Sequence, residues 1–326
     1  MKDVLISAPY MLPFMQRFTP VLTRLGMRVI IPDVHERLSE EELLRYAGQF
    51  DGTICGDDRY TRRVIQACHP RLKVISKWGT GIDSIDQEAA AEFGIGVRNT
   101  PNAFTVPVAE SVLGYMLSFA RRFGTMDSAM KAGEWKKIPG YTLSEKTLGV
   151  VGVGNVGKAV LRRARAFGMT LLGNDIVEIA PDFLLENSVE SVPLRELLER
   201  SDFISLNCSL NPSSYHLMNA ESFGWCKPGA LLINTARGPV VEEAALVSAL
   251  QSGRLAGAAL DVFEVEPLPA ESPLLGMENV FLAPHNSNSS PFYWERVHWN
   301  SIRNLALGLE LPVGDIANIK ALEQQA

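Results

Sequence analysis

The stretch Leu148-Gly-Val-Val-Gly-Val-Gly-Asn-Val-Gly157 carries the strongest structural signal in the sequence. It starts as an apolar strand and ends in Gly152-x-Gly154-x-x-Gly157, directly before a helical pattern expected over 158–168. Glycines at this spacing allow a tight turn, close approach of backbone N–H groups to a pyrophosphate, and close packing of helix on strand. The same glycines can also mark a plain turn, so the context must decide.

An acidic residue supplies that context. Asp175 ends the next expected strand, TLLGND, about 20 residues beyond the turn, where a carboxylate accepts hydrogen bonds from a ribose 2′-hydroxyl. A carboxylate there repels a 2′-phosphate, and the following residues 176–178 contain no Arg or Lys. The pattern therefore favours NAD over NADP as the cofactor.

Short apolar runs alternate with amphipathic stretches on both sides of this turn. In the first hundred residues, strands are expected over 4–9, 27–32, 50–55 and 72–79, with a helix over 39–48 that has Ser39 as its N-cap. A long helical pattern over 106–122 leads into a segment expected to be irregular, Gly124–Ser144, and then into a second alternating unit that runs to about Pro284. The alternation predicts parallel sheets covered on both faces.

The composition excludes several classes of protein. The 326 residues are 46% hydrophobic and 21% charged, with a net charge of −6, which argues against phosphate-backbone binding as the main task. The four cysteines have neither disulfide-framework nor zinc-site spacing, so no metal is expected. No apolar run approaches a membrane span and the N-terminus lacks the features of a signal peptide, so a cytoplasmic location is expected.

Three later segments carry chemically useful side chains at strand ends. Arg237 follows the strand expected in ALLINTA, Asp261 and Glu266 follow GAAL, and His285 follows VFLAP. In open α/β sheets ligands bind beyond the carboxyl ends of the strands, and a guanidinium matches a carboxylate bidentately. Taken singly, each side chain is more often structural. The other four histidines lack a chemical neighbour in the sequence, and packing or surface positions are expected for His35, His69, His216 and His298.

The ordered set of motifs resembles the D-isomer-specific 2-hydroxyacid dehydrogenase family over nearly the whole chain. The matching segments are the glycine turn, then 201–238, ALDVFEVEP and APH; SKWGTGIDSID and NTPNAFTVPVAE look like the substrate loop and interdomain helix of its phosphoglycerate dehydrogenase-like branch. The resemblance implies an NAD-dependent oxidoreductase that interconverts a D-2-hydroxy acid and its 2-keto acid. It implies catalytic roles for Arg237, which binds the substrate, for His285, the general acid–base, and for Glu266, its partner.

The resemblance also implies the residues that hold cofactor and substrate. Asp261 is expected to accept a hydrogen bond from the nicotinamide carboxamide, and Lys77, Trp78 and Gly79 are expected to bind substrate, the last two through backbone N–H groups around them. The expected cofactor contacts are Gly152, Gly154, Asn155, Val156, Gly157, Asp175, Asn207, Cys208, Thr235, Ala236, Asp261 and Thr105.

The family's architecture implies two doubly wound parallel-sheet domains, Rossmann-like and flavodoxin-like, with the active site in the cleft between them. The expected substrate-binding domain is discontinuous, 1–101 plus 290–326, and the NAD-binding domain spans 102–289. A homodimer built through the long helix and the Gly124–Ser144 segment is expected.

Some positions depart from the phosphoglycerate dehydrogenase pattern. Where that branch commonly has a phosphate-binding Arg, this chain has Cys55, followed by Asp57 and Asp58; the basic residues Arg59 and Lys77 leave a phosphorylated substrate as an alternative. The segment after His285 is unusually polar (286–290, NSNSS). A rival hypothesis is an NAD-sensing, corepressor-like scaffold of the same superfamily.

Overall fold

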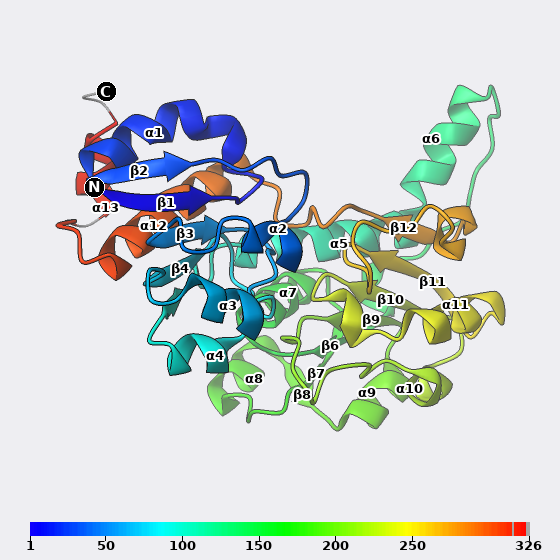
Figure 1. Cartoon of the computed structure of the whole chain (residues 1–326). Helices are drawn as coiled ribbons and strands as arrows, with labels where there is room; N and C mark the ends of the chain where they lie inside the picture. The colour runs from blue at the N-terminus through cyan, green and yellow to red at the C-terminus, as the bar shows by residue number, and fades with distance from the viewer. Residues whose placement is uncertain (315, 324–326) are drawn as a thin grey trace. The chain divides into compact units, whose positions relative to one another are not determined.

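The computed structural model describes residues 1–314 and 316–323, and the chain divides into two compact units (Figure 1). Unit 1 comprises Met1–Phe104 and Ser289–Ala326, and unit 2 comprises Thr105–Asn288. The predicted boundary at 101/102 falls in the turn that precedes the helix beginning at Thr105, so the division comes a few residues later.

Unit 1 contains a five-stranded, fully parallel sheet with the order β2-β1-β3-β4-β5. Its strands are β1 (Lys2–Ile6), β2 (Met27–Ile30), β3 (Gly52–Cys55), β4 (Val74–Lys77) and β5 (Gly96–Arg98). β3 and β4 are buried along their whole length, as central parallel strands must be. The short edge strand β5 was not expected, because only three residues pair and they are largely exposed.

Helices cover this sheet. They are α1 (Met15–Arg24), α2 (Glu40–Leu44), α3 (Arg62–Cys68), α4 (Gln87–Glu92), α12 (Pro291–Gly308) and α13 (Ile316–Ala321), with a 3₁₀ turn at Leu12–Phe14. Ser39 caps α2 through a capping box with Glu42, as predicted, although the helix ends at Leu44 and not at residue 48. The C-terminal α12 packs on β3 and β4, where a Cβ on Gly308 would lie 2.3 Å from Val74 Cγ2.

Unit 2 contains a seven-stranded parallel sheet with the order β12-β11-β10-β9-β6-β7-β8. Its strands are β6 (Thr147–Val151), β7 (Thr170–Asn174), β8 (Val189–Ser191), β9 (Phe203–Leu206), β10 (Ala230–Asn234), β11 (Leu255–Leu260) and β12 (Val280–Leu282). The strand order reverses between β6 and β9, which makes this the point where a doubly wound sheet binds ligands. The predicted fold class of two doubly wound parallel-sheet domains is confirmed.

Two apolar cores sandwich this sheet, because successive strand residues face opposite sides. Phe203 belongs to one core and Ile204 to the other. The helices are α5 (Thr105–Arg121), α6 (Phe123–Lys131), α7 (Asn155–Ala166), α8 (Pro181–Asn187), α9 (Leu194–Arg200), α10 (Ala220–Trp225) and α11 (Glu243–Gln251), with 3₁₀ turns at Leu143–Glu145, Gly238–Val240 and Pro273–Gly276.

The expectation of an irregular segment over Gly124–Ser144 was wrong in its first part. Residues Phe123–Lys131 form α6, which Figure 1 shows extending away from the rest of its unit. None of its residues is buried, so the sequence lacks the apolar periodicity that marks a packed helix. Arg122, in left-handed conformation at φ 52°, separates α6 from α5. Among the described residues, no helix is long and apolar enough to cross a bilayer.

Candidate active site

The glycine turn between β6 and α7 has the geometry that its sequence predicts. Gly152 adopts φ +88°, and a Cβ there would lie 2.5 Å from the backbone nitrogen of Cys208. A Cβ on Gly157 would lie 2.0 Å from the carbonyl oxygen of Gly152. Neither position can hold a side chain without moving the backbone, whereas Gly154 faces open space as the N-cap of α7. Gly154 makes no side-chain cap, so the α7 N-terminus presents its first-turn N–H groups and a positive dipole end at this turn.

Asp175 is fixed beside this turn. Its carboxylate accepts hydrogen bonds from the N–H groups of Val153 (2.6 Å) and Val177 (3.1 Å). The negative charge therefore lies at the carboxyl end of β7, next to the glycine turn that follows β6. This position fits a ribose diol and disfavours a 2′-phosphate.

Two buried side-chain oxygens at the same sheet edge need a partner. Within the part of the chain that the structure describes, Asn207 Oδ1 and Thr235 Oγ1 have no hydrogen-bond partner. They follow β9 and β10, where a dinucleotide crosses the sheet edge in such folds. Buried polar atoms are rarely left unsatisfied, so these two oxygens fit a bound cofactor.

The remaining expected cofactor residues belong to α7, the segment after β10 and α5. Asn155 and Val156 form the first turn of α7, Ala236 follows Thr235, and Thr105 begins α5. Burial raises the pKa of the Cys208 thiol to about 11, so it is neutral at pH 7.

Asp261 holds the loop that carries the predicted acid–base histidine. The residue is 2% exposed, and its carboxylate accepts N–H bonds from Asn286 (2.7 Å) and Ser287 (2.9 Å). Its carbonyl oxygen accepts the N–H of His285 at 2.8 Å. The unusually polar segment after His285 is thus anchored through its backbone to Asp261.

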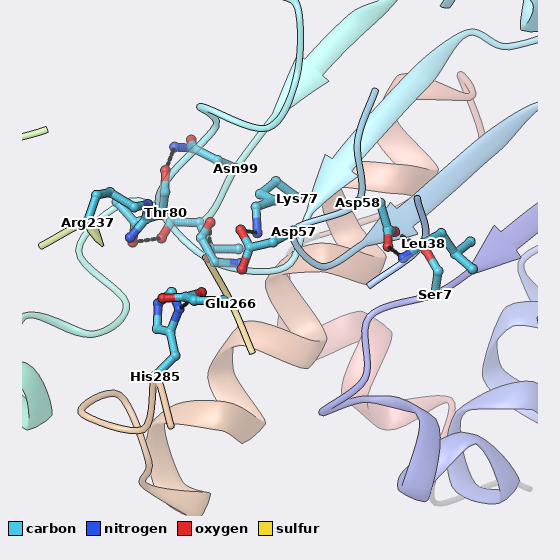
Figure 2. Close-up of polar contacts among 12 residues, drawn as sticks. Ser7, Leu38, Asp57, Asp58, Lys77, Thr80, Asn99, Arg237, Glu266 and His285 are labelled. Atoms are coloured by element: carbon cyan, nitrogen blue, oxygen red, sulfur yellow. Dashed lines mark hydrogen bonds and ion pairs between the residues drawn. The ribbon is translucent and has the colours of Figure 1, made fainter. Parts of the chain in front are cut away.

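His285 and Glu266 lie side by side, as Figure 2 shows. His285 Nδ1 is 3.1 Å from Glu266 Oε2, and Glu266 Oε1 accepts the N–H of Phe263 at 3.0 Å. Both side chains are about four-fifths buried, at 22% and 19% exposure. A carboxylate on Nδ1 fixes the imidazole tautomer and leaves Nε2 for proton transfer.

Arg237 follows the neighbouring strand. Its carbonyl oxygen accepts a hydrogen bond from Asn234 Nδ2 (3.0 Å), and its Nη1 donates to the carbonyl oxygen of Ala236 (2.8 Å). Arg237, Glu266 and His285 therefore follow β10, β11 and β12, three consecutive strands at one side of the sheet.

The expected substrate residues of unit 1 lie at the carboxyl end of β4, with Lys77 its last residue and Trp78 and Gly79 directly after it. Lys77 Nζ pairs with Asp57 Oδ1 at 2.9 Å (Figure 2), and its side chain is only 4% exposed. Trp78 is buried and donates its indole N–H to His298 Nδ1 at 2.9 Å. Gly79 adopts φ +127°, which favours glycine.

Two backbone N–H groups of this loop have hydrogen-bond partners within unit 1. The N–H of Trp78 donates to the carbonyl oxygen of Cys55 (2.8 Å) and that of Gly79 to Thr100 Oγ1 (3.2 Å). The β3–β4 ladder continues one residue past Lys77, so the Trp78 N–H is used inside the unit. A substrate carboxylate can reach the Gly79 N–H only by displacing the Thr100 hydroxyl.

Comparison with known proteins now identifies the chain's relatives. The model of the D-isomer specific 2-hydroxyacid dehydrogenase NAD binding domain matches residues 113–287. The chain belongs to the D-isomer specific 2-hydroxyacid dehydrogenase family. The expected cofactor, NAD, is confirmed for this domain.

Similar members of this dehydrogenase family are named after different substrates. A glyoxylate reductase of Korarchaeum cryptofilum is 43% identical over 227 residues, 68% of each chain. A D-3-phosphoglycerate dehydrogenase of Methanocaldococcus jannaschii is 41% identical over 263 residues, 79% of this chain and 49% of that protein. The chain thus spans about half the length of the phosphoglycerate dehydrogenase.

Solved structures of the family match the whole fold. The D-lactate dehydrogenase from Aquifex aeolicus, complexed with NAD and lactic acid, has a TM-score of 0.84 at 27% identity and covers 98% of both chains. The TT0316 protein from Thermus thermophilus has a TM-score of 0.81 at 34% identity, covering 94% of this chain and 97% of that one. None of these names supports a corepressor-like scaffold.

Two polar pairs in this dehydrogenase were missed from the sequence. His216, expected to pack without a chemical neighbour, contacts Glu264, and His298 accepts the Trp78 indole N–H. Their partners lie 48 and 220 residues away along the chain, so no local pattern could have revealed them.

Proposed function

We propose that this family member reduces a 2-keto acid to the D-2-hydroxy acid with NADH, and catalyses the reverse reaction with NAD. The observation that carries the proposal is the placement of Arg237, Glu266 and His285 after three adjacent strands, with His285 Nδ1 3.1 Å from Glu266. A guanidinium, a carboxylate and an imidazole are the groups that this reaction requires.

Each residue has a defined task in the proposed reaction. NADH, held at the glycine turn 152–157 and by Asp175, would supply a hydride to the carbonyl carbon. The imidazolium of His285 gives its Nε2 proton to the carbonyl oxygen, so that hydride and proton together convert C=O to CH–OH. Glu266 favours the protonated imidazole and fixes its orientation. The Arg237 guanidinium binds the substrate and polarises its carbonyl.

The substrate carboxylate is assigned to the loop 77–79. The bond from the Gly79 N–H to the Thr100 hydroxyl is long, at 3.2 Å, and both groups are neutral. A carboxylate forms a stronger, charge-assisted bond with the same N–H, so it can replace the hydroxyl.

We further propose that the substrate side chain carries no phosphate. The Lys77 ammonium already faces the Asp57 carboxylate at 2.9 Å. Asp58 is buried and accepts hydrogen bonds from Ser7 and from the N–H of Leu38 (Figure 2). A phosphate near Lys77 would have to compete with Asp57, and Cys55 supplies no cation.

We also propose that the protein forms a homodimer and is located in the cytoplasm. α6 has no buried residue, and the segment around it exposes large apolar side chains: Phe123 (54%), Met130 (51%) and Trp135 (87%). Exposed apolar side chains gathered on one projecting segment favour association. All four cysteines are free thiols, in keeping with a reducing compartment.

The test follows NADH absorbance while the protein is offered glyoxylate, pyruvate, phenylpyruvate and 3-phosphohydroxypyruvate. We expect turnover with at least one unphosphorylated acid and little with the phosphorylated one. NADH binding without oxidation by any acid would favour the scaffold hypothesis over the enzyme. Preferred turnover of 3-phosphohydroxypyruvate would refute the assignment of an unphosphorylated substrate. The oligomeric state is read from light scattering, where a monomer would refute the dimer.

A further inference from the structure

A second histidine–carboxylate pair lies in unit 2, outside the residues assigned to the reaction. His216 Nε2 is 2.5 Å from Glu264 Oε1, and each side chain is 29% exposed. His216 belongs to the loop after β9, whereas Glu264 belongs to the loop after β11, two residues before Glu266. The pair therefore connects loops of two strands that are separated in the sheet by β10.

His216 is also bonded to the intervening loop. Its backbone N–H donates to the carbonyl oxygen of Pro239 at 2.8 Å, two residues after Arg237. His216 has a left-handed backbone, φ 48°, and its carbonyl oxygen accepts a hydrogen bond from Asn219 Nδ2 at 3.0 Å. A left-handed histidine is uncommon and persists where surrounding contacts hold it. One residue thus connects the loops after β9, β10 and β11.

Glu264 is held at both oxygens. Oε1 contacts His216, and Oε2 accepts the N–H of Glu243, the first residue of α11, at 3.0 Å. The carboxylate therefore lies at a helix N-terminus, where a negative charge is favourable. With both oxygens engaged, Glu264 fixes its own stretch of the β11 loop.

The fixed stretch of loop reaches the proposed catalytic groups within a few bonds. Glu264 adjoins Phe263, whose N–H donates to Glu266 Oε1 at 3.0 Å, and Glu266 Oε2 contacts His285. The Phe263 carbonyl oxygen also abuts the residue after Arg237, because a Cβ on Gly238 would lie 1.8 Å from it. A displacement of Glu264 therefore moves the supports of both Arg237 and Glu266.

We propose that His216 and Glu264 are positioning residues that clamp these three loops and thereby orient Glu266 against His285. The inference rests on the proposed function of Glu266 and His285. A residue that only stabilised the fold would leave the orientation of Glu266 against His285 unchanged. In this proposal that orientation depends on the contact between His216 and Glu264.

The test compares Glu264→Ala with Glu264→Gln in the full-length protein. For the Ala variant we expect kcat to fall by about 10–100-fold, the size of effect that a misplacement near 1 Å produces, with the Kd for NADH within about twofold of the parent. We also expect the pH profile of kcat for reduction to move to lower pH, since a misplaced Glu266 supports the protonated imidazole less well. Gln can accept from the Glu243 N–H and donate to His216 Nε2, so it should restore most of kcat.

The control is Glu271→Ala, which removes an exposed carboxylate from the same β11–β12 connection as Glu264 and should leave kcat unchanged. Hydrogen exchange of residues 261–267 reports the loop without turnover, and we expect faster exchange only in Glu264→Ala. An unchanged kcat and pH profile in Glu264→Ala would overturn the proposal, as would equal losses in the Ala and Gln variants. If the Ala variant fails to fold, the Gln variant still decides: kcat near the parent value supports the clamp, and a large loss overturns it. If none of the 2-keto acids supports NADH oxidation by the parent protein, the proposed function is refuted. The clamp is then judged from the hydrogen-exchange result alone.

Discussion

Unit 1 should lose stability in mild acid because of one buried histidine. Burial lowers the pKa of His298 to about 4 from its ordinary value of 6.5. The side chain lies among Phe14, Phe18 and Trp78, and its Nδ1 accepts the Trp78 indole N–H. Protonation would place a hydrogen on Nδ1, directly against that donor.

The stability falls in acid because the unfolded chain binds the His298 proton at a higher pH than the folded chain does. As the pH falls below 6.5, His298 becomes protonated in the unfolded chain but stays neutral in the folded one, so stability is lost between about pH 6.5 and about pH 4. With these two pKa values, His298 alone should lower the free energy of unfolding by about 2 kcal/mol between pH 7 and pH 5. Glu295, which favours the charged ring, and Arg17, which disfavours it, are both already reflected in the folded pKa.

The assay is urea unfolding at pH 7 and pH 5, followed by tryptophan fluorescence. Three of the five tryptophans, Trp78, Trp294 and Trp299, lie in unit 1. The comparison is with His298→Gln, which keeps an acceptor for the Trp78 indole and cannot titrate. The parent should lose about 2 kcal/mol more than the variant over this interval, whatever their difference at pH 7. Equal losses in both proteins would refute the reasoning.

Three further predictions concern the proposed reaction and its cofactor. In His285→Ala, NADH oxidation should slow by about 10²–10⁴-fold, while fluorescence titration shows unchanged NADH binding; retained turnover would mean that another group supplies the proton. In Asp175→Ala, the preference for NADH over NADPH in kcat/KM should fall at least about tenfold, and an unchanged ratio would contradict charge repulsion as its cause. In Gly157→Ala, the new Cβ meets the Gly152 carbonyl, so thermal unfolding should report about 1–3 kcal/mol of destabilisation and NADH binding should weaken. Gly224→Ala, with open space at its Cβ, is the matched control, and equal melting temperatures for the two variants would contradict the steric argument.

The sequence predicts features that arise within a few consecutive residues. The glycine turn at 152–157 and the Ser39 cap are such features, because neighbouring residues determine turn and cap geometry. α6 was missed because an unpacked helix has no buried stripe to reveal it, and β5 because a three-residue edge strand resembles a loop.

Contacts between distant residues account for what could not be predicted. The pairing of His216 with Glu264 requires the sheet order that brings the loops after β9 and β11 near each other. Likewise, the acceptor of the Trp78 N–H depends on how far the β3–β4 ladder continues. Family resemblance supplied the roles of Arg237, Glu266 and His285, and these roles stay predictions until the variants are measured.

The division of unit 1 into two chain segments has a consequence for synthesis on the ribosome. The last helix to pack on β3 and β4, α12, begins only at Pro291, after all of unit 2 has been made. Until then the apolar face around Val74, which α12 covers through Leu305 and Gly308, lacks its partner. Unit 2 is continuous in sequence and can complete its sheet first. The nascent unit 1 keeps an uncovered apolar face on β3 and β4 until α12 has been synthesised.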